Sequence, residues 1–122
     1  MTPAELEERT FQFGVRVVKL AMHLARRRGI SFRLIDQLVG AGTSVGANVE
    51  ESHAAVSKPD FLNKRGIALK ECRESVYFLR VLEASGAATR TMVGTLVAEG
   101  REIGKILAKG IITTKRSLGI TD

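Results

Sequence analysis

The fold of this chain is decided first in residues 2–29, which read TPAELEERTFQFGVRVVKLAMHLARRRG. Apolar side chains recur there at the spacing of an α-helix, and no alternation typical of a strand is present. Two adjacent stripes make an apolar face wider than one partner helix needs, so we expect this helix to serve its own core and a neighbouring subunit. The first stripe is Leu6, Phe13, Val17, Leu20 and Leu24, and the second is Phe11, Val15, Val18, Met22 and Ala25.

Both ends of this segment carry helix signals. Thr2 and Glu5 stand at the spacing of a capping box, in which each residue satisfies a backbone N–H of the first turn. At the other end, the cations of Arg26–Arg28 suit the negative end of a helix, and Gly29 is a typical terminating residue. The pattern predicts a helix over residues 3–28.

The second segment begins after Ser31, a candidate N-cap, and predicts a helix over residues 32–53. Gly40, Gly42 and Gly46 interrupt its middle, and each costs about 1 kcal/mol relative to Ala. We expect these glycines to permit close approach of a neighbouring helix.

Two more helices are predicted over residues 58–85, after the N-cap Ser57, and over residues 90–116, after Thr89 or Thr91. The β-branched residues 111–114 leave the end of the last helix open. Short connections between long amphipathic helices predict an all-α, antiparallel up-down four-helix bundle, with residues 1–122 forming a single domain.

Composition narrows the class of protein. The chain has 122 residues, a net charge of +6 and a sequence pI near 10.0. No apolar run is long enough to span a membrane, and the acidic first turn does not look like a secretory signal. A single cysteine, Cys72, rules out an internal disulfide framework. These features lead us to expect a soluble, cytoplasmic protein.

Residue types give little support for catalysis. Gly40-x-Gly42-x-x-x-Gly46 lacks the strand and the Gly-Lys-Ser/Thr of nucleotide-binding loops. Glu50-x-x-His53 is only half of the motif that a di-metal bundle requires. Cys72 falls on an apolar stripe, as a buried structural cysteine does, and Ser44 with His53 has no triad context. We expect no catalytic residue, no metal and no cofactor, and therefore no enzyme.

Basic residues are the more informative feature. Because aromatic residues are only 5% of the chain, few side chains are available to stack on bases. We therefore expect any nucleic-acid binding to depend on phosphate contacts. The alternative is a solvated surface that keeps the protein soluble. The candidate nucleic-acid-binding residues are Arg16, Lys19, Arg26, Arg27, Arg28, Lys105, Lys109 and Lys115.

The middle third of the chain resembles a known family. Two motifs carry the resemblance: Ser44-Val45-Gly46-Ala47-Asn48-Val49-x-Glu51, and Ile67-Ala68-Leu69-Lys70-Glu71-x-x-Glu74-x-x-Tyr77-x-Leu79. They resemble the small four-helix-bundle proteins encoded by intervening sequences within 23S ribosomal RNA genes. That family includes the accessory variability determinant proteins of diversity-generating retroelements. Gly40 and Ser52 depart from it, standing where the family often has Arg and usually has Gly.

The resemblance implies a homopentameric barrel that binds nucleic acid, such as structured RNA or an RNA–DNA hybrid, and that acts as an accessory to a reverse transcriptase. The alternative function is a protein-interaction scaffold whose charged surface docks a partner protein. Carboxylates of the motifs have the residue types of a catalytic pair, but no polar pocket is implied around them. We expect a structural polar edge made of Ser44, Asn48, Glu51 and Glu71.

Overall fold

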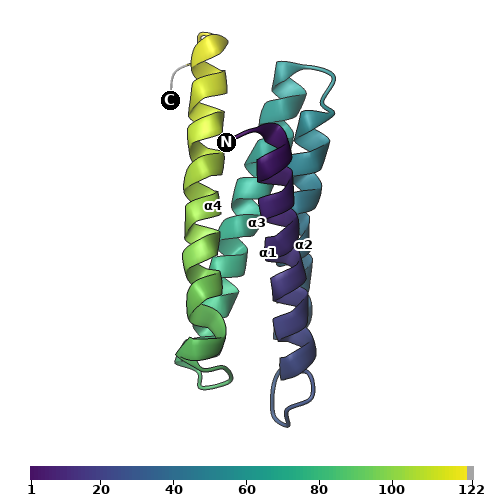
Figure 1. Ribbon diagram of the computed structural model, residues 1–122, viewed down its shortest axis with the longest axis vertical. Helices are drawn as coiled ribbons and strands as arrows, with labels where there is room; N and C mark the ends of the chain where they lie inside the picture. Colours follow the sequence, from purple (N-terminus) through teal and green to yellow (C-terminus); the bar gives the residue numbers. More distant parts are fainter. Residues whose placement is uncertain (121–122) are drawn as a thin grey trace.

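The computed structural model describes residues 1–120 as four helices in up-down order. Helix α1 spans Pro3–Leu24, α2 spans Phe32–His53, α3 spans Lys58–Ala84 and α4 spans Arg90–Ser117. Consecutive helices run antiparallel, so the α1–α2 and α3–α4 connections lie at one end of the bundle (Figure 1). We call this end the loop end. The N-terminus, the end of α4 and the α2–α3 connection lie at the opposite, terminal end. The all-α, up-down four-helix bundle is confirmed.

Helix starts follow the sequence signals. The Thr2 hydroxyl accepts a hydrogen bond from the Glu5 N–H, and the Glu5 carboxylate accepts one from the Thr2 N–H, which completes the capping box. Ser31, Ser57 and Thr89 cap the other three helices in the same way, each accepting from the N–H three residues on.

The end of α1 differs from the prediction, because this helix ends at Leu24 and not at Arg28. Leu24 is completely buried, and every residue from Ala25 to Gly29 is exposed. Helices in proteins depend on tertiary packing, so nothing stabilises further turns once the buried face stops. Arg26, Arg27 and Arg28 therefore lie in the turn after the helix. At the other end of the chain, α4 runs through the β-branched residues 111–114 to Ser117.

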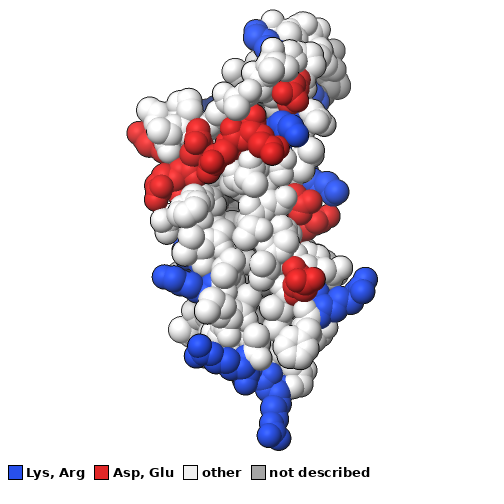
Figure 2. Space-filling view, turned by 90° about the vertical axis from the view of Figure 1, so that its right-hand side faces the viewer, with Lys and Arg blue, Asp and Glu red and all other residues white. Residues whose placement is uncertain are grey.

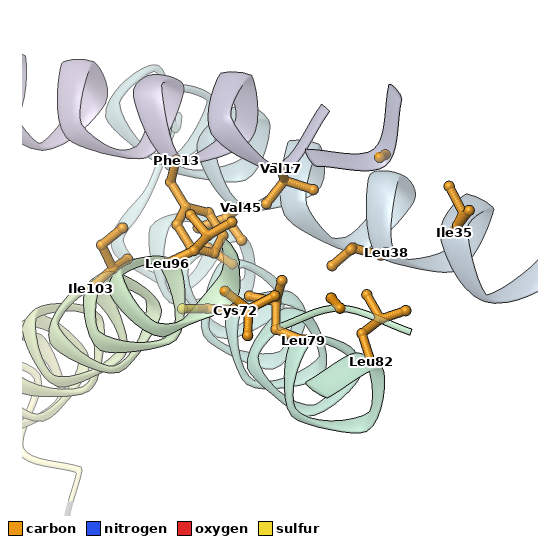
Figure 3. Close-up of a cluster of buried hydrophobic side chains, with 14 of the residues drawn as sticks. Phe13, Val17, Ile35, Leu38, Val45, Cys72, Leu79, Leu82, Leu96 and Ile103 are labelled. Carbon is orange, nitrogen blue, oxygen red and sulfur yellow. The ribbon is translucent and has the colours of Figure 1, made fainter. Parts of the chain in front are cut away.

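One continuous core runs along the bundle axis (Figure 3). The first stripe of α1 supplies Phe13 and Val17, which are fully buried against Val45 of α2, Leu79 of α3 and Ile103 of α4. Tight α1–α2 packing depends on small residues. A Cβ on Gly42 would stand 2.7 Å from Val17 Cγ1, and one on Gly46 would stand 3.2 Å from the Thr10 carbonyl oxygen.

Candidate functional site

The turn after α1 concentrates positive charge at the loop end. Arg26, Arg27, Arg28 and Arg33 are exposed, and none of them forms an ion pair within residues 1–120. Figure 2 shows the face formed by α1 and α2, with Lys and Arg side chains at its lower end and no acidic side chain beside them. Arg27 also has a structural role, because its Nη1 donates to the Ala87 carbonyl at 2.9 Å and ties the two loops together.

A second group of basic residues lines the outer face of α3 and α4. Arg73, Arg101 and Lys105 line one recess, and Arg80, Arg90 and the same Arg101 line the next one towards the loop end. We call these five residues the α3–α4 strip. Glu83 is the only acidic residue lining the two recesses in the described chain, and it pairs with Arg90. The strip thus leads from mid-bundle to the loop end.

Of the candidates chosen from the sequence, only Lys105 belongs to this strip. Arg73, Arg80, Arg90 and Arg101 were missed because a charge count along a helix does not show which face neighbouring helices share. Their signal was present: Arg73 and Arg80 lie seven residues apart, on one face of an α-helix.

The other candidates are dispersed. Arg16 donates from Nη2 to the Thr95 hydroxyl of α4 at 3.0 Å, and Lys19 lines a groove between α1 and α2. Lys109 and Lys115 lie in the second half of α4, towards the terminal end and away from the Arg26–Arg28 turn. The eight residues therefore do not form one surface on a single chain.

The second stripe of α1 faces outward. Phe11 and Met22 are 54% and 58% exposed, and Phe11, Val15 and Val18 line a groove of about 590 Å³ between α1 and α2. The other wall, from α2, consists of Thr43, Gly46, Ala47 and Glu50. The middle of this face is without charge in Figure 2. It is an apolar surface that the chain's own core does not use.

Within residues 1–120, the four residues expected to form a polar edge are not joined in one network of hydrogen bonds and ion pairs. The Asn48 amide donates to the Ser44 carbonyl of its own helix at 2.9 Å. Glu51 pairs with Lys64 of α3 at 3.2 Å. Glu71 lies beside Glu74, and burial together with that second carboxylate raises the pKa of Glu71.

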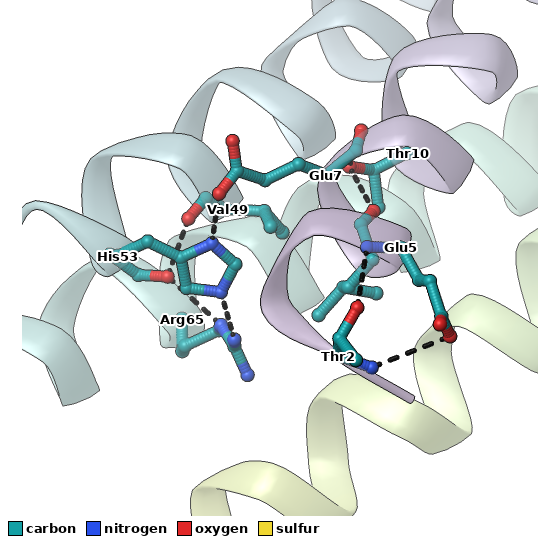
Figure 4. A network of polar contacts seen from close by, with 9 residues as sticks. Thr2, Glu5, Glu7, Thr10, Val49, His53 and Arg65 are labelled. Atoms are coloured by element: carbon teal, nitrogen blue, oxygen red, sulfur yellow. Dashed lines mark hydrogen bonds and ion pairs between the residues drawn. The ribbon is translucent and has the colours of Figure 1, made fainter.

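A partly buried polar network at the terminal end was missed. His53 Nδ1 lies 2.6 Å from a Glu7 carboxylate oxygen of α1, and His53 Nε2 lies 2.8 Å from Nη2 of Arg65 on α3 (Figure 4). Arg65 Nε donates to the Ser52 hydroxyl at 3.0 Å. The helical spacing indicated this position, because Arg65 lies on the same face of α3 as the buried residues Ala68, Cys72, Ser75, Leu79 and Leu82.

The remaining reactive groups have structural surroundings. The Cys72 thiol donates to the Gly100 carbonyl at 3.0 Å, and burial raises its pKa to about 11. Within residues 1–120, no three His, Cys, Asp or Glu side chains are grouped as a metal site requires. In the same part of the chain, no helix has the length and apolarity needed to cross a membrane.

Comparisons with known proteins place this bundle in a family. The 23S rRNA-intervening sequence protein family matches residues 4–109. A crystal structure of a protein of unknown function from the S23 ribosomal protein family of Bacteroides thetaiotaomicron is similar, with 34% sequence identity and a TM-score of 0.82. The match covers 87% of this chain and 97% of that one. No curated protein sequence matches. The fold and the sequence together establish that this chain belongs to the 23S rRNA-intervening sequence protein family.

Proposed function

We propose that this protein is a non-enzymatic, basic oligomer that binds nucleic acid through its phosphates, with structured RNA or an RNA–DNA hybrid as the ligand. The observation that carries this proposal is the α3–α4 strip, which leads to the arginines of the loop end. Phosphate contacts provide affinity without reading bases, so we expect weak sequence preference. The family resemblance adds a reverse transcriptase as the protein partner of such a complex.

Oligomerisation would multiply this charge. The outward stripe of α1 and its apolar groove are the surface we assign to a neighbouring subunit, and the number five comes from the family resemblance. Five copies of a +6 chain carry a charge of five times six, or +30. Such a field strengthens attraction to a phosphate backbone and speeds association at low salt.

Salt dependence is the first test of nucleic-acid binding. Affinity for an RNA duplex should fall log-linearly with salt, with a slope of about −0.9 per phosphate contacted, or about −0.7 on single strands. The test variant is Arg26→Gln with Arg28→Gln, which leaves the Arg27 bond to Ala87 in place. Losing two phosphate contacts per site should reduce the slope by about 1.8 on duplex and about 1.4 on single strands.

The matched control is Lys58→Gln with Arg116→Gln, which removes the same charge at the terminal end. If both variants weaken binding equally, net charge alone is responsible and the loop-end assignment is wrong. A second pair, Arg80→Gln with Arg101→Gln, examines the α3–α4 strip by the same measurement. Unchanged affinity of all three variants at low salt would favour the protein-interaction scaffold.

Assembly has its own test, because exposed phenylalanines occur both inside and outside the groove. Phe11→Ser should reduce the mass measured by light scattering, since Phe11 lines the groove. Phe32→Ser is the control, because Phe32 is 74% exposed and does not line it. A wild-type monomer at every concentration would overturn the oligomer.

A further inference from the structure

Within residues 1–120, Arg65 is a buried cation without a carboxylate partner. Its side chain lies on the buried face of α3, and the residue is only 7% exposed. No ion pair within residues 1–120 includes it. Buried charges in proteins are normally paired, since taking a lone ion out of water costs several kcal/mol. Burial accordingly lowers the pKa of the Arg65 guanidinium.

Neutral groups hold this guanidinium in place. Nε donates to the Ser52 hydroxyl, Nη2 donates to His53 Nε2, and the Phe61 ring centroid lies 4.6 Å from the guanidinium carbon. Because arginine has only donors, His53 Nε2 must accept, and the ring proton on Nδ1 is then donated to Glu7. Glu7 therefore reaches Arg65 only through the imidazole ring, as Figure 4 shows.

The third nitrogen, Nη1, is available to a ligand. It has no hydrogen-bond acceptor among the described residues, whereas every fully buried side-chain nitrogen or oxygen there has a partner. Nη1 is therefore not completely buried. It lies beside Gly110 of α4, where a Cβ would stand only 2.9 Å away. Gly110 thus leaves room for this nitrogen that any larger residue would fill.

Arg65 lines a recess at the terminal end of the bundle. The recess has a volume of about 480 Å³, and both Arg65 and Gly110 line it. One part of the wall is polar, with Lys109, Thr113 and Thr114, and another is apolar, with Leu6, Phe61 and Ile106. Within residues 1–120, no acidic side chain lines it. Arg65 and Lys109, the three threonines Thr2, Thr113 and Thr114, and an apolar wall match an anion attached to an apolar body.

We propose that this recess binds a phosphate monoester, with the phosphate at Arg65 Nη1 and Lys109 and the organic part against Leu6, Phe61 and Ile106. A dianionic phosphate supplies the carboxylate-like partner that Arg65 lacks, and its oxygens are strong acceptors for the guanidinium. The bonds to Ser52 and His53 fix the orientation of Arg65 before the ligand arrives, which reduces the entropy cost of binding.

The probe is phenyl phosphate, titrated by isothermal calorimetry at low salt. We expect saturable binding with one site per chain, and weaker binding of inorganic phosphate, which lacks the apolar body. Arg65→Met should reduce affinity by about 10- to 150-fold, the loss expected for a charge-assisted hydrogen bond. Far-UV circular dichroism verifies that this variant still folds.

Two surface variants keep the proposal testable if Arg65→Met unfolds. Lys109→Gln should weaken binding about two- to five-fold, as expected for an exposed charge. Gly110→Ala should weaken it as well, because the new Cβ displaces Nη1. Lys105→Gln is the control, since Lys105 lies one turn earlier on α4 and does not line the recess.

A dinucleotide with a 5′-phosphate, compared with its 5′-hydroxyl form, distinguishes the two sources of such a phosphate. Tighter binding of the phosphorylated dinucleotide than of phenyl phosphate assigns a strand end. Binding of phenyl phosphate without binding of either dinucleotide assigns a free ester. Absence of phenyl phosphate binding, or wild-type affinity in Lys109→Gln and Gly110→Ala, overturns the site. The variant Arg26→Gln with Arg28→Gln should bind phenyl phosphate normally, so this test is independent of the loop-end interface.

Discussion

Gly40, Gly42 and Gly46 lie in the middle of α2 but have different neighbours, so Gly→Ala can be compared at three positions of one helix. Gly→Ala in a helix interior gains about 1 kcal/mol from backbone propensity, provided that the methyl group has room. At Gly40 nothing lies within 4 Å of the added Cβ. Gly40→Ala should therefore stabilise the protein by up to about 1 kcal/mol.

At Gly42 the same methyl group would meet three atoms of one side chain. The Cβ would stand 2.7, 2.9 and 3.0 Å from Cγ1, Cγ2 and Cβ of Val17. Val17 is fully buried, and a β-branched side chain in a helix has essentially one rotamer, so it cannot turn away. At Gly46 the obstacle is the backbone of Thr10 at 3.2 Å. Overpacking of this kind costs about 1–3 kcal/mol, which cancels or exceeds the propensity gain.

The difference between Gly40→Ala and Gly42→Ala removes the shared propensity gain and leaves the packing cost of about 1–3 kcal/mol. For a domain of this size, about 4 °C per kcal/mol places the two melting temperatures roughly 4–12 °C apart. Circular dichroism at 222 nm measures both, at one protein concentration because assembly shifts apparent stability. Equal melting temperatures of the two variants would refute the close-approach role of Gly42.

Three further predictions concern ionisable groups. Hydrogen bonds from Arg9, at 2.7 and 2.8 Å, lower the pKa of Glu99 in the folded protein. The pair therefore stabilises the fold above the ordinary carboxyl pKa of about 4.3. This stabilisation is lost as the pH falls through the lowered pKa of Glu99 in the folded state. In urea unfolding, Glu99→Gln should cost about 1 kcal/mol at pH 7 and progressively less below pH 4, and a constant cost would contradict this. Burial and Glu74 raise the pKa of Glu71, so Glu71→Gln should hold or raise the melting temperature at pH 7, whereas a fall would indicate a cation supplied by another subunit. Because the pKa of Cys72 is about 11, a thiol reagent at pH 8 should label the folded protein far more slowly than the unfolded one.

The sequence by itself determined the helices, because capping and periodicity are local properties. Thr2 and Glu5 form the predicted capping box, and the first stripe of α1 is the stripe that enters the core, with Phe13 and Val17 fully buried. Four such amphipathic segments with short connections leave few arrangements other than an up-down bundle. The residues of the family motifs likewise identified the family.

Tertiary structure decided which charges share a surface and which are buried. The α3–α4 strip forms where one face of α3 meets one face of α4. The Arg26–Arg28 turn and Lys109 lie towards opposite ends of the bundle because consecutive helices run antiparallel. In the sequence, Arg65 is not distinguished from the other basic residues. In the structure, it contacts Ser52 and His53 of α2 and Phe61 of α3. Burial and pairing are sums over neighbours distant in the chain, and local spacing does not contain them.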